Sequence, residues 1–169
     1  MEMANFVGIC YCELGDFQKG LVIFNEIASQ DNPKYAEDVV KAKENIKLYT
    51  NNRIAKLQGE NDFDGIIAVA DEMLAVNPQD ALAQKIRLQA LFDKKDYAGV
   101  IASAEEAAAG QTDEEERSDV YFILGAAYNA RTMPQQAIDA LSKVTAGANV
   151  AAAQKTVAQL KENAAKANS

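Results

Sequence analysis

The sequence predicts an all-α fold assembled from repeated pairs of helices. Apolar residues recur at spacings of three and four, and no segment alternates with the period of two that marks a strand. Residues 53–75 return 34 positions later as residues 87–109, with nine identical positions. A fixed period in this range is typical of stacked helical repeats. The three prolines fall between the helical segments, which favours the same interpretation.

The first predicted helix pair spans about residues 1–33. Gly15, Asp16 and Phe17 predict the turn between its two helices. Gly8 and Gly20 have no side chain, so they predict places where the two helices approach closely. The facing positions of the two helices are Val7, Gly8, Tyr11, Gly20, Phe24 and Ile27.

The last helix pair repeats this arrangement 117 residues later, with Leu124, Gly125, Tyr128, Ala137, Leu141 and Val144. These two sets of residues resemble the tetratricopeptide repeat (TPR) family. The unit of that family is a helix-turn-helix of 34 residues, with Leu-Gly and Tyr on the first helix and Ala, Phe and Pro on the second. The resemblance covers about residues 1–148.

The resemblance implies one domain over residues 1–169, a right-handed TPR-like α-solenoid of about nine helices. Its helix-turn-helix units are offset by 46, 34 and 37 residues and end in a C-terminal capping helix. The expected units are residues 1–33, 34–78, 79–111 and 112–148, followed by the capping helix over 149–167.

The two inner units depart from the family pattern. Ile54 and Leu88 stand where glycine is expected, and Ala70 and Ala104 stand where a bulky residue is expected. We therefore expect the inner units to place large residues on their first helices and small ones on their second.

Two inner positions carry arginine where leucine is expected. For Arg53 and Arg87 the sequence leaves two structural roles open. Either the side chains extend to solvent along apolar surface, or they pair with a carboxylate such as Asp62 or Asp96.

The extra residues between the first two units predict one long helix over 34–58. Asn32 is a helix-capping residue, Pro33 suits the first helical position, and no helix breaker follows before Gly59. The first turns of this helix either cover the neighbouring unit or form a dimer contact.

Two further helix starts are predicted by local motifs. Residues 112–115 form a capping box, so their acidic run indicates a helix start rather than a binding motif. Residues 132–135 open the next helix in the same manner. The amphipathic tail after Gly147 either caps the last repeat or docks on another chain.

Composition narrows the class of function. The net charge of −8 disfavours nucleic acid and anionic membrane surfaces, and no run of apolar residues is long enough for membrane insertion. The chain has no histidine, phosphate loop or metal-ligand spacing, which argues against an enzyme and against any cofactor. Cys10 and Cys12 form no disulfide framework. They favour the cytoplasm, with a periplasmic or secreted location open if the chain belongs to a longer precursor.

Members of the resembled family bind peptides on a concave groove lined by the first helix of each unit. Transferring the groove-facing positions of the first unit by the three offsets gives a predicted partner-binding set: Asn5, Ile9, Asn51, Gln58, Lys85, Gln89, Phe92, Phe122 and Asn129. Amides hydrogen-bond a peptide backbone, and the two phenylalanines either anchor an apolar side chain or fill the gap between helices. No clamp for a terminal carboxylate is expected.

The sequence thus predicts a non-catalytic scaffold that binds a peptide or protein segment. Two alternatives stay open. One is a structural self-assembly module that forms a homodimer through the 34–58 helix or the C-terminal helix, and the other is a regulatory section of a larger protein.

Overall fold

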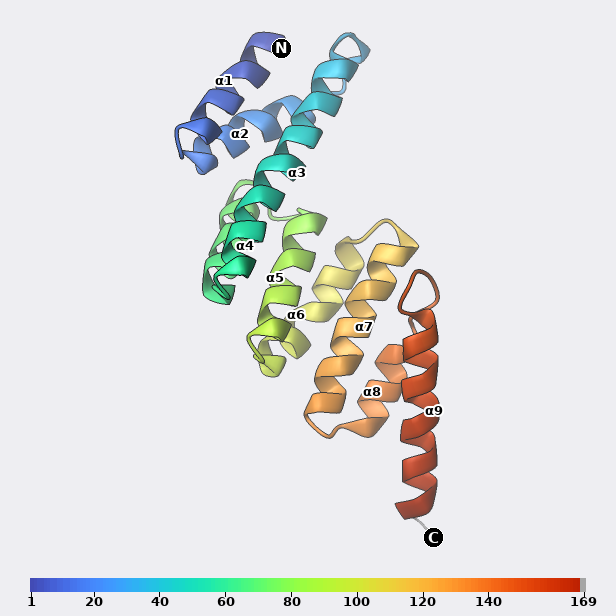
Figure 1. Cartoon of the computed structure of the whole chain (residues 1–169). Coiled ribbons are helices and arrows are strands. Elements are labelled where there is room, and N and C mark those ends of the chain that lie inside the picture. Colours follow the sequence, from blue (N-terminus) through green and yellow to red (C-terminus); the bar gives the residue numbers. More distant parts are fainter. Residues whose placement is uncertain (168–169) are drawn as a thin grey trace. The chain divides into compact units, whose positions relative to one another are not determined.

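The protein is helical throughout the part that the structure describes, residues 1–167 of a computed structural model, and this range contains no strand (Figure 1). The all-α prediction is confirmed. None of the helices combines the length and apolar character that crossing a membrane requires. The helices are α1 (Glu2–Glu13), α2 (Phe17–Ala28), the 3-10 turn η1 (Pro33–Tyr35), α3 (Ala36–Gly59), α4 (Phe63–Val76), α5 (Ala81–Asp93), α6 (Tyr97–Gly110), α7 (Glu114–Ala130), α8 (Pro134–Leu141) and α9 (Val150–Ala167).

The chain forms two compact units, residues 1–83 and the chain from residue 84 onward. In the first unit α1 packs on α2, α2 on α3, and α3 on α4. In the second unit α6 packs on α7, α7 on α8, and α8 on α9. Consecutive helices therefore pack as in a helical repeat. The single-domain organisation stays a prediction.

The same backbone turn joins the two helices of four pairs. Its central residues are Gly15, Asn61, Lys95 and Thr132, which have φ values of 86°, 54°, 66° and 55°. In each turn this residue donates its N–H to the carbonyl three residues earlier, and the next N–H bonds the carbonyl five residues earlier. These are the two hydrogen bonds of a Schellman motif. The turns are spaced by 46, 34 and 37 residues, the offsets that the sequence predicts for its units.

Small residues set the close approach of the outer helix pairs. A Cβ atom on Gly8 would lie 2.5 Å from Cε1 of Phe24, and one on Gly125 would lie 2.5 Å from Cγ of Leu141. A Cβ on Gly20 would meet the Cys12 sulfur at 2.3 Å. The close approach predicted at these glycines is confirmed.

The inner pairs use the opposite arrangement, as the sequence predicts. Ala70 and Ala104 are fully buried on α4 and α6, and Leu88 on α5 is 1% exposed. Ile54 on α3 is half-buried. Large residues on the first helix and alanine on the second thus replace the glycine and bulky residue of the outer pairs.

Arg53 has both a carboxylate partner and an aromatic one. Its Nη1 atom lies 2.8 Å from Oε2 of Glu72, and its guanidinium lies 4.2 Å from the centre of the Phe17 ring. The predicted pairing of Arg53 with a carboxylate is confirmed, but the partner is Glu72 rather than Asp62. Asp62 instead caps α4, where it accepts a hydrogen bond from the Gly65 N–H. The Asp62 carboxylate is therefore engaged by the backbone at the start of its own helix.

The first turns of α3 cover the first helix pair. Nδ2 of Asn5 on α1 donates to the Asp38 carbonyl at 3.0 Å. Ala42 is fully buried in a cluster with Phe24 and Ile27 of α2. This is the first of the two roles that the sequence leaves open for the start of the long helix.

Two helix starts differ in detail from the sequence predictions. The cap of α7 is Asp113 rather than Thr112, and Asp113 Oδ1 accepts from the N–H groups of Glu115 and Glu116. At α8, Thr132 does not cap the helix, because it lies in the left-handed turn. Met133 occupies the cap position without a side-chain hydrogen bond.

The last helix packs on the preceding helix pair within the second unit. Ala153 of α9 is buried against Leu141 and Val144.

Candidate binding surfaces

Four of the nine predicted partner-binding residues are exposed amides. Asn51 and Gln58 lie on α3, Gln89 on α5, and Asn129 on α7. Gln89 donates to Asp93 at 2.9 Å, one turn along the same helix. Exposed amides offer both a donor and an acceptor, so these four positions suit recognition of a peptide backbone.

Two predicted residues of α1 belong instead to the packing of the first unit. Asn5 is 4% exposed and its Nδ2 atom holds the start of α3, while its Oδ1 atom has no hydrogen-bond partner. Ile9 packs against the buried cluster around Phe24. Asn5 is enclosed by the neighbouring helices, and Ile9 is partly buried in the same packing.

The two predicted phenylalanines take part in packing within the second unit. Phe92 meets the ring of Tyr97 edge to face, with the ring centres 5.6 Å apart. Phe122 packs against the cluster that joins α8 to α9, which contains Leu141, Val144 and Ala153. Both contacts match the gap-filling alternative, in which these rings stabilise adjacent helices.

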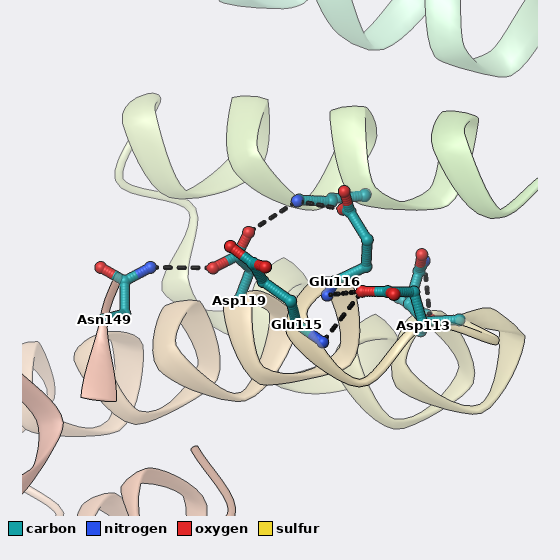
Figure 2. Close-up of polar contacts among 8 residues, drawn as sticks. Asp113, Glu115, Glu116, Asp119 and Asn149 are labelled. Atoms are coloured by element: carbon teal, nitrogen blue, oxygen red, sulfur yellow. Dashed lines mark hydrogen bonds and ion pairs between the residues drawn. The ribbon is translucent and has the colours of Figure 1, made fainter. Parts of the chain in front are cut away.

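Lys85, the one basic residue of the predicted set, lies in a polar network with Asp119 and Glu116, which Figure 2 labels. Its Nζ atom is 2.7 Å from Oδ2 of Asp119 and also contacts Glu116. Burial alone would lower the pKa of Lys85, but its bonds to Asp119 and Glu116 outweigh burial and raise the pKa. The ammonium group is therefore protonated and neutralised by α7.

The same network holds the segment that leads into α9. Asn149 donates to the second oxygen of Asp119 at 2.9 Å, so Asp119 bridges α5 and this segment (Figure 2). The buried Ser118 hydroxyl accepts from the N–H groups of Thr145 and Ala146 at 3.2 and 3.1 Å. These contacts tie the α8–α9 connection to α7 and position the last helix.

A cleft that the sequence analysis missed runs beside α2 in the first unit. One part has a volume of about 610 Å³ and lies between α2 and the end of α4, and a second part of about 400 Å³ reaches α3 and the segment 77–82. Asn25, Ser29 and Asn77 line both parts. The lining residues come from α2, α3, α4 and the segment 77–82, which share no common motif. The only local signal is the Asn-Pro turn at residues 77–78, where Asn77 accepts from the Gln79 N–H.

Cysteine and carboxylate side chains are candidate metal ligands and nucleophiles among the described residues. Within residues 1–167 no three His, Cys, Asp or Glu side chains are grouped to hold a metal ion. Burial raises the pKa of the Cys12 thiol, with a further contribution from Glu13, so this thiol stays protonated at neutral pH. Histidine is absent from the whole sequence.

Comparison with known proteins adds no assignment. No model of a known protein family matches the sequence, and the search of curated proteins found no match.

Proposed function

We propose that the protein is a non-catalytic interaction scaffold with a TPR-like α-solenoid fold, which binds a peptide or protein segment through the first helices of its pairs. The observation that carries the proposal is the turn that recurs at Gly15, Asn61, Lys95 and Thr132 with the predicted unit offsets. Repeats of helix pairs create extended surfaces that bind other polypeptides.

The exposed amides on α3, α5 and α7 support the same proposal. The predicted set, once reduced to its exposed members, contains no charged side chain and no apolar anchor. Within the second unit, a partner segment is therefore recognised mainly through its backbone amides, which pair with Gln89 and Asn129. Asn51 and Gln58 offer the same chemistry in the first unit. The self-assembly and regulatory alternatives lack a comparable observation.

A peptide-display selection on the intact chain tests the proposal. Enriched peptides are synthesised and titrated against the wild type and against a Gln89→Ala/Asn129→Ala variant of the second unit. Loss of amide bonds predicts binding weaker by about tenfold for the double variant, since each bond contributes about 0.5–1.5 kcal/mol. Truncation of Phe122 is unsuitable as a test, because this partly buried ring packs against the core cluster of α8 and α9.

The matched control is Gln136→Ala, which removes an exposed amide from α8. Equal affinity of the control and the wild type, with a loss for the double variant, supports the proposal. Failure to enrich any peptide, or an unchanged affinity for the double variant, contradicts it.

A further inference from the structure

An uncharged apolar stripe runs along the exposed side of α1. Met3, Phe6 and Val7 are 77%, 61% and 40% exposed, Leu14 at the C-cap of the helix is 83% exposed, and the half-buried Cys10 lies among them. At about 100° per residue, these five positions fall within roughly 100° of the helix circumference. They form what we term the α1 stripe.

The exposed apolar area of the α1 stripe is larger than that of single apolar residues scattered over a protein surface. Side chains of these sizes and exposures present about 500 Å² of surface, near the upper end of apolar patches on monomeric proteins, and such patches are often functional. A stable interface buries about 800 Å² on each partner. The α1 stripe therefore matches a single helix better than a second folded copy of the chain.

The first helix pair, which carries the α1 stripe, is acidic. Residues 1–33 contain five carboxylates and one lysine, and that lysine, Lys19, is paired with Asp16 at 2.8 Å. By helical position Glu2 and Glu13 share one flank of the stripe, three turns or about 16 Å apart along the axis. One oxygen of Glu13 accepts a hydrogen bond from Tyr49. Helix α1 itself carries no basic side chain, whereas α3, which packs on α1, carries both lysines and carboxylates.

We propose that the α1 stripe binds an amphipathic helix of a partner protein, with Lys or Arg side chains along one edge of that helix's apolar face. Apolar anchors at helical spacing match the α1 stripe, and two basic residues about eleven positions apart match Glu2 and Glu13. A second copy would oppose carboxylates with carboxylates, and an anionic bilayer would be repelled in the same way. This surface is distinct from the amide positions of the proposed function.

The test uses designed helical peptides of about 18 residues, long enough to span α1. One carries a leucine stripe with two arginines about eleven residues apart on one edge, and the other carries glutamates at those two positions. Each is titrated by fluorescence anisotropy against the intact chain. We expect the arginine peptide to bind at least about tenfold more tightly, with the difference falling in about 0.5 M salt.

Variants of the protein locate the site. Phe6→Asp should weaken binding of the arginine peptide by about 30-fold, as expected for loss of an interface anchor. Val40→Asp is the control, because Val40 on α3 is 54% exposed and lies outside the α1 stripe. Glu2→Gln/Glu13→Gln should weaken binding by about fivefold and keep the acceptor for Tyr49. Circular dichroism checks that each variant is folded.

Several results would overturn the proposal. These are equal binding of the two peptides, no binding of either, or an unchanged affinity for the Phe6→Asp variant. Sedimentation that shows a dimer broken by Phe6→Asp would assign the α1 stripe to a second copy. Adsorption of the chain to phosphatidylserine vesicles, abolished by the same substitution, would assign it to a membrane surface.

Discussion

At the scale of single residues, the backbone conformation of four turn positions governs where each helix pair folds back. Only Gly15 is a glycine, while Asn61, Lys95 and Thr132 hold positive φ values that cost L-residues about 1–2 kcal/mol. The Schellman hydrogen bonds and the packed helices on either side compensate for that cost.

Two glycines in open space separate the backbone effect from packing. A Cβ atom added at either Gly15 or Gly59 meets no atom within 4 Å, but only Gly15 has a positive φ. Gly15→Ala should lower the free energy of unfolding by about 1 kcal/mol, whereas Gly59→Ala should raise it by about 0.5–1 kcal/mol. Urea denaturation monitored by circular dichroism measures both. The same sign for both substitutions would contradict this account of the turn.

Tyr49 provides a second prediction for a single residue. Its hydroxyl donates to Glu13 at 2.7 Å, and this bond raises the pKa of Tyr49 to about 12. Because the folded pKa lies above the ordinary value of 10.0, the contribution of this pair to stability is complete below pH 10.0 and is lost as pH rises toward about 12.

The substitution Glu13→Gln tests that cause. It removes the carboxylate charge but keeps an acceptor, so the pKa of Tyr49 should fall back toward 10.0. Spectrophotometric titration of the tyrosines measures the change, and Tyr49→Phe identifies the late-titrating phenol. A late titration that persists in Glu13→Gln would exclude Glu13 as its cause.

At the scale of helix pairs, the chain uses two complementary ways to bring helices together. The outer pairs match glycine with a bulky residue, as at Gly125 and Leu141. The inner pairs carry a large residue on the first helix and alanine on the second, as at Leu88 and Ala104. Either arrangement fills the space between helices, which close packing requires.

Transfer of the inner arrangement to the last pair tests this equivalence. Gly125→Leu alone should destabilise the protein by about 3 kcal/mol, because its side chain overlaps Leu141. In the double variant Gly125→Leu/Leu141→Ala, the loss of unfolding free energy should be smaller than the sum of the two single losses by about 1–3 kcal/mol. A double-mutant cycle from urea denaturation measures the coupling. Strictly additive losses would show that the two residues do not share one space.

The polar network in Figure 2 stabilises the second unit through partly buried ions. Lys85 and Asp119 are 25% and 26% exposed at their side chains, whereas the exposed pair Lys166 and Glu162 is 70% and 57% exposed. Lys85→Met should therefore lower the free energy of unfolding by about 1 kcal/mol or more, because it leaves Asp119 without its cation. Lys166→Met should change it by less than about 0.5 kcal/mol. Thermal unfolding compares them, and equal effects would contradict a special role for the network.

At the scale of the whole molecule, the sequence predicted helices, turns and large-to-small packing well because these depend on local spacing. It predicted the binding residues less well. Two neighbouring faces of a helix differ by about 100°, which is the rotation of a single residue. Transferring positions from one unit to the next by a fixed offset therefore separates groove-facing residues poorly from residues that pack between helices. Asn5 and Ile9 show this, since the offset mapping places both in the groove and both take part in packing.

Sequence patterns also did not predict which side chains far apart in the chain form ion pairs. The partner of Arg53 is Glu72 rather than Asp62, and Lys85 is neutralised by α7. These choices depend on which side chains come within about 4 Å after folding. The cleft beside α2 was missed for the same reason, because its lining joins separate elements.

Hydrogen–deuterium exchange on the intact chain, with and without a peptide obtained by display, tests the proposed scaffold most directly. The account predicts slower exchange on binding in α3, α5 or α7, where the exposed amides lie. It also predicts little change in α4, α6 and α8, the second helices of their pairs. Protection confined to these second helices, or no protection at a saturating peptide concentration, would contradict the proposal.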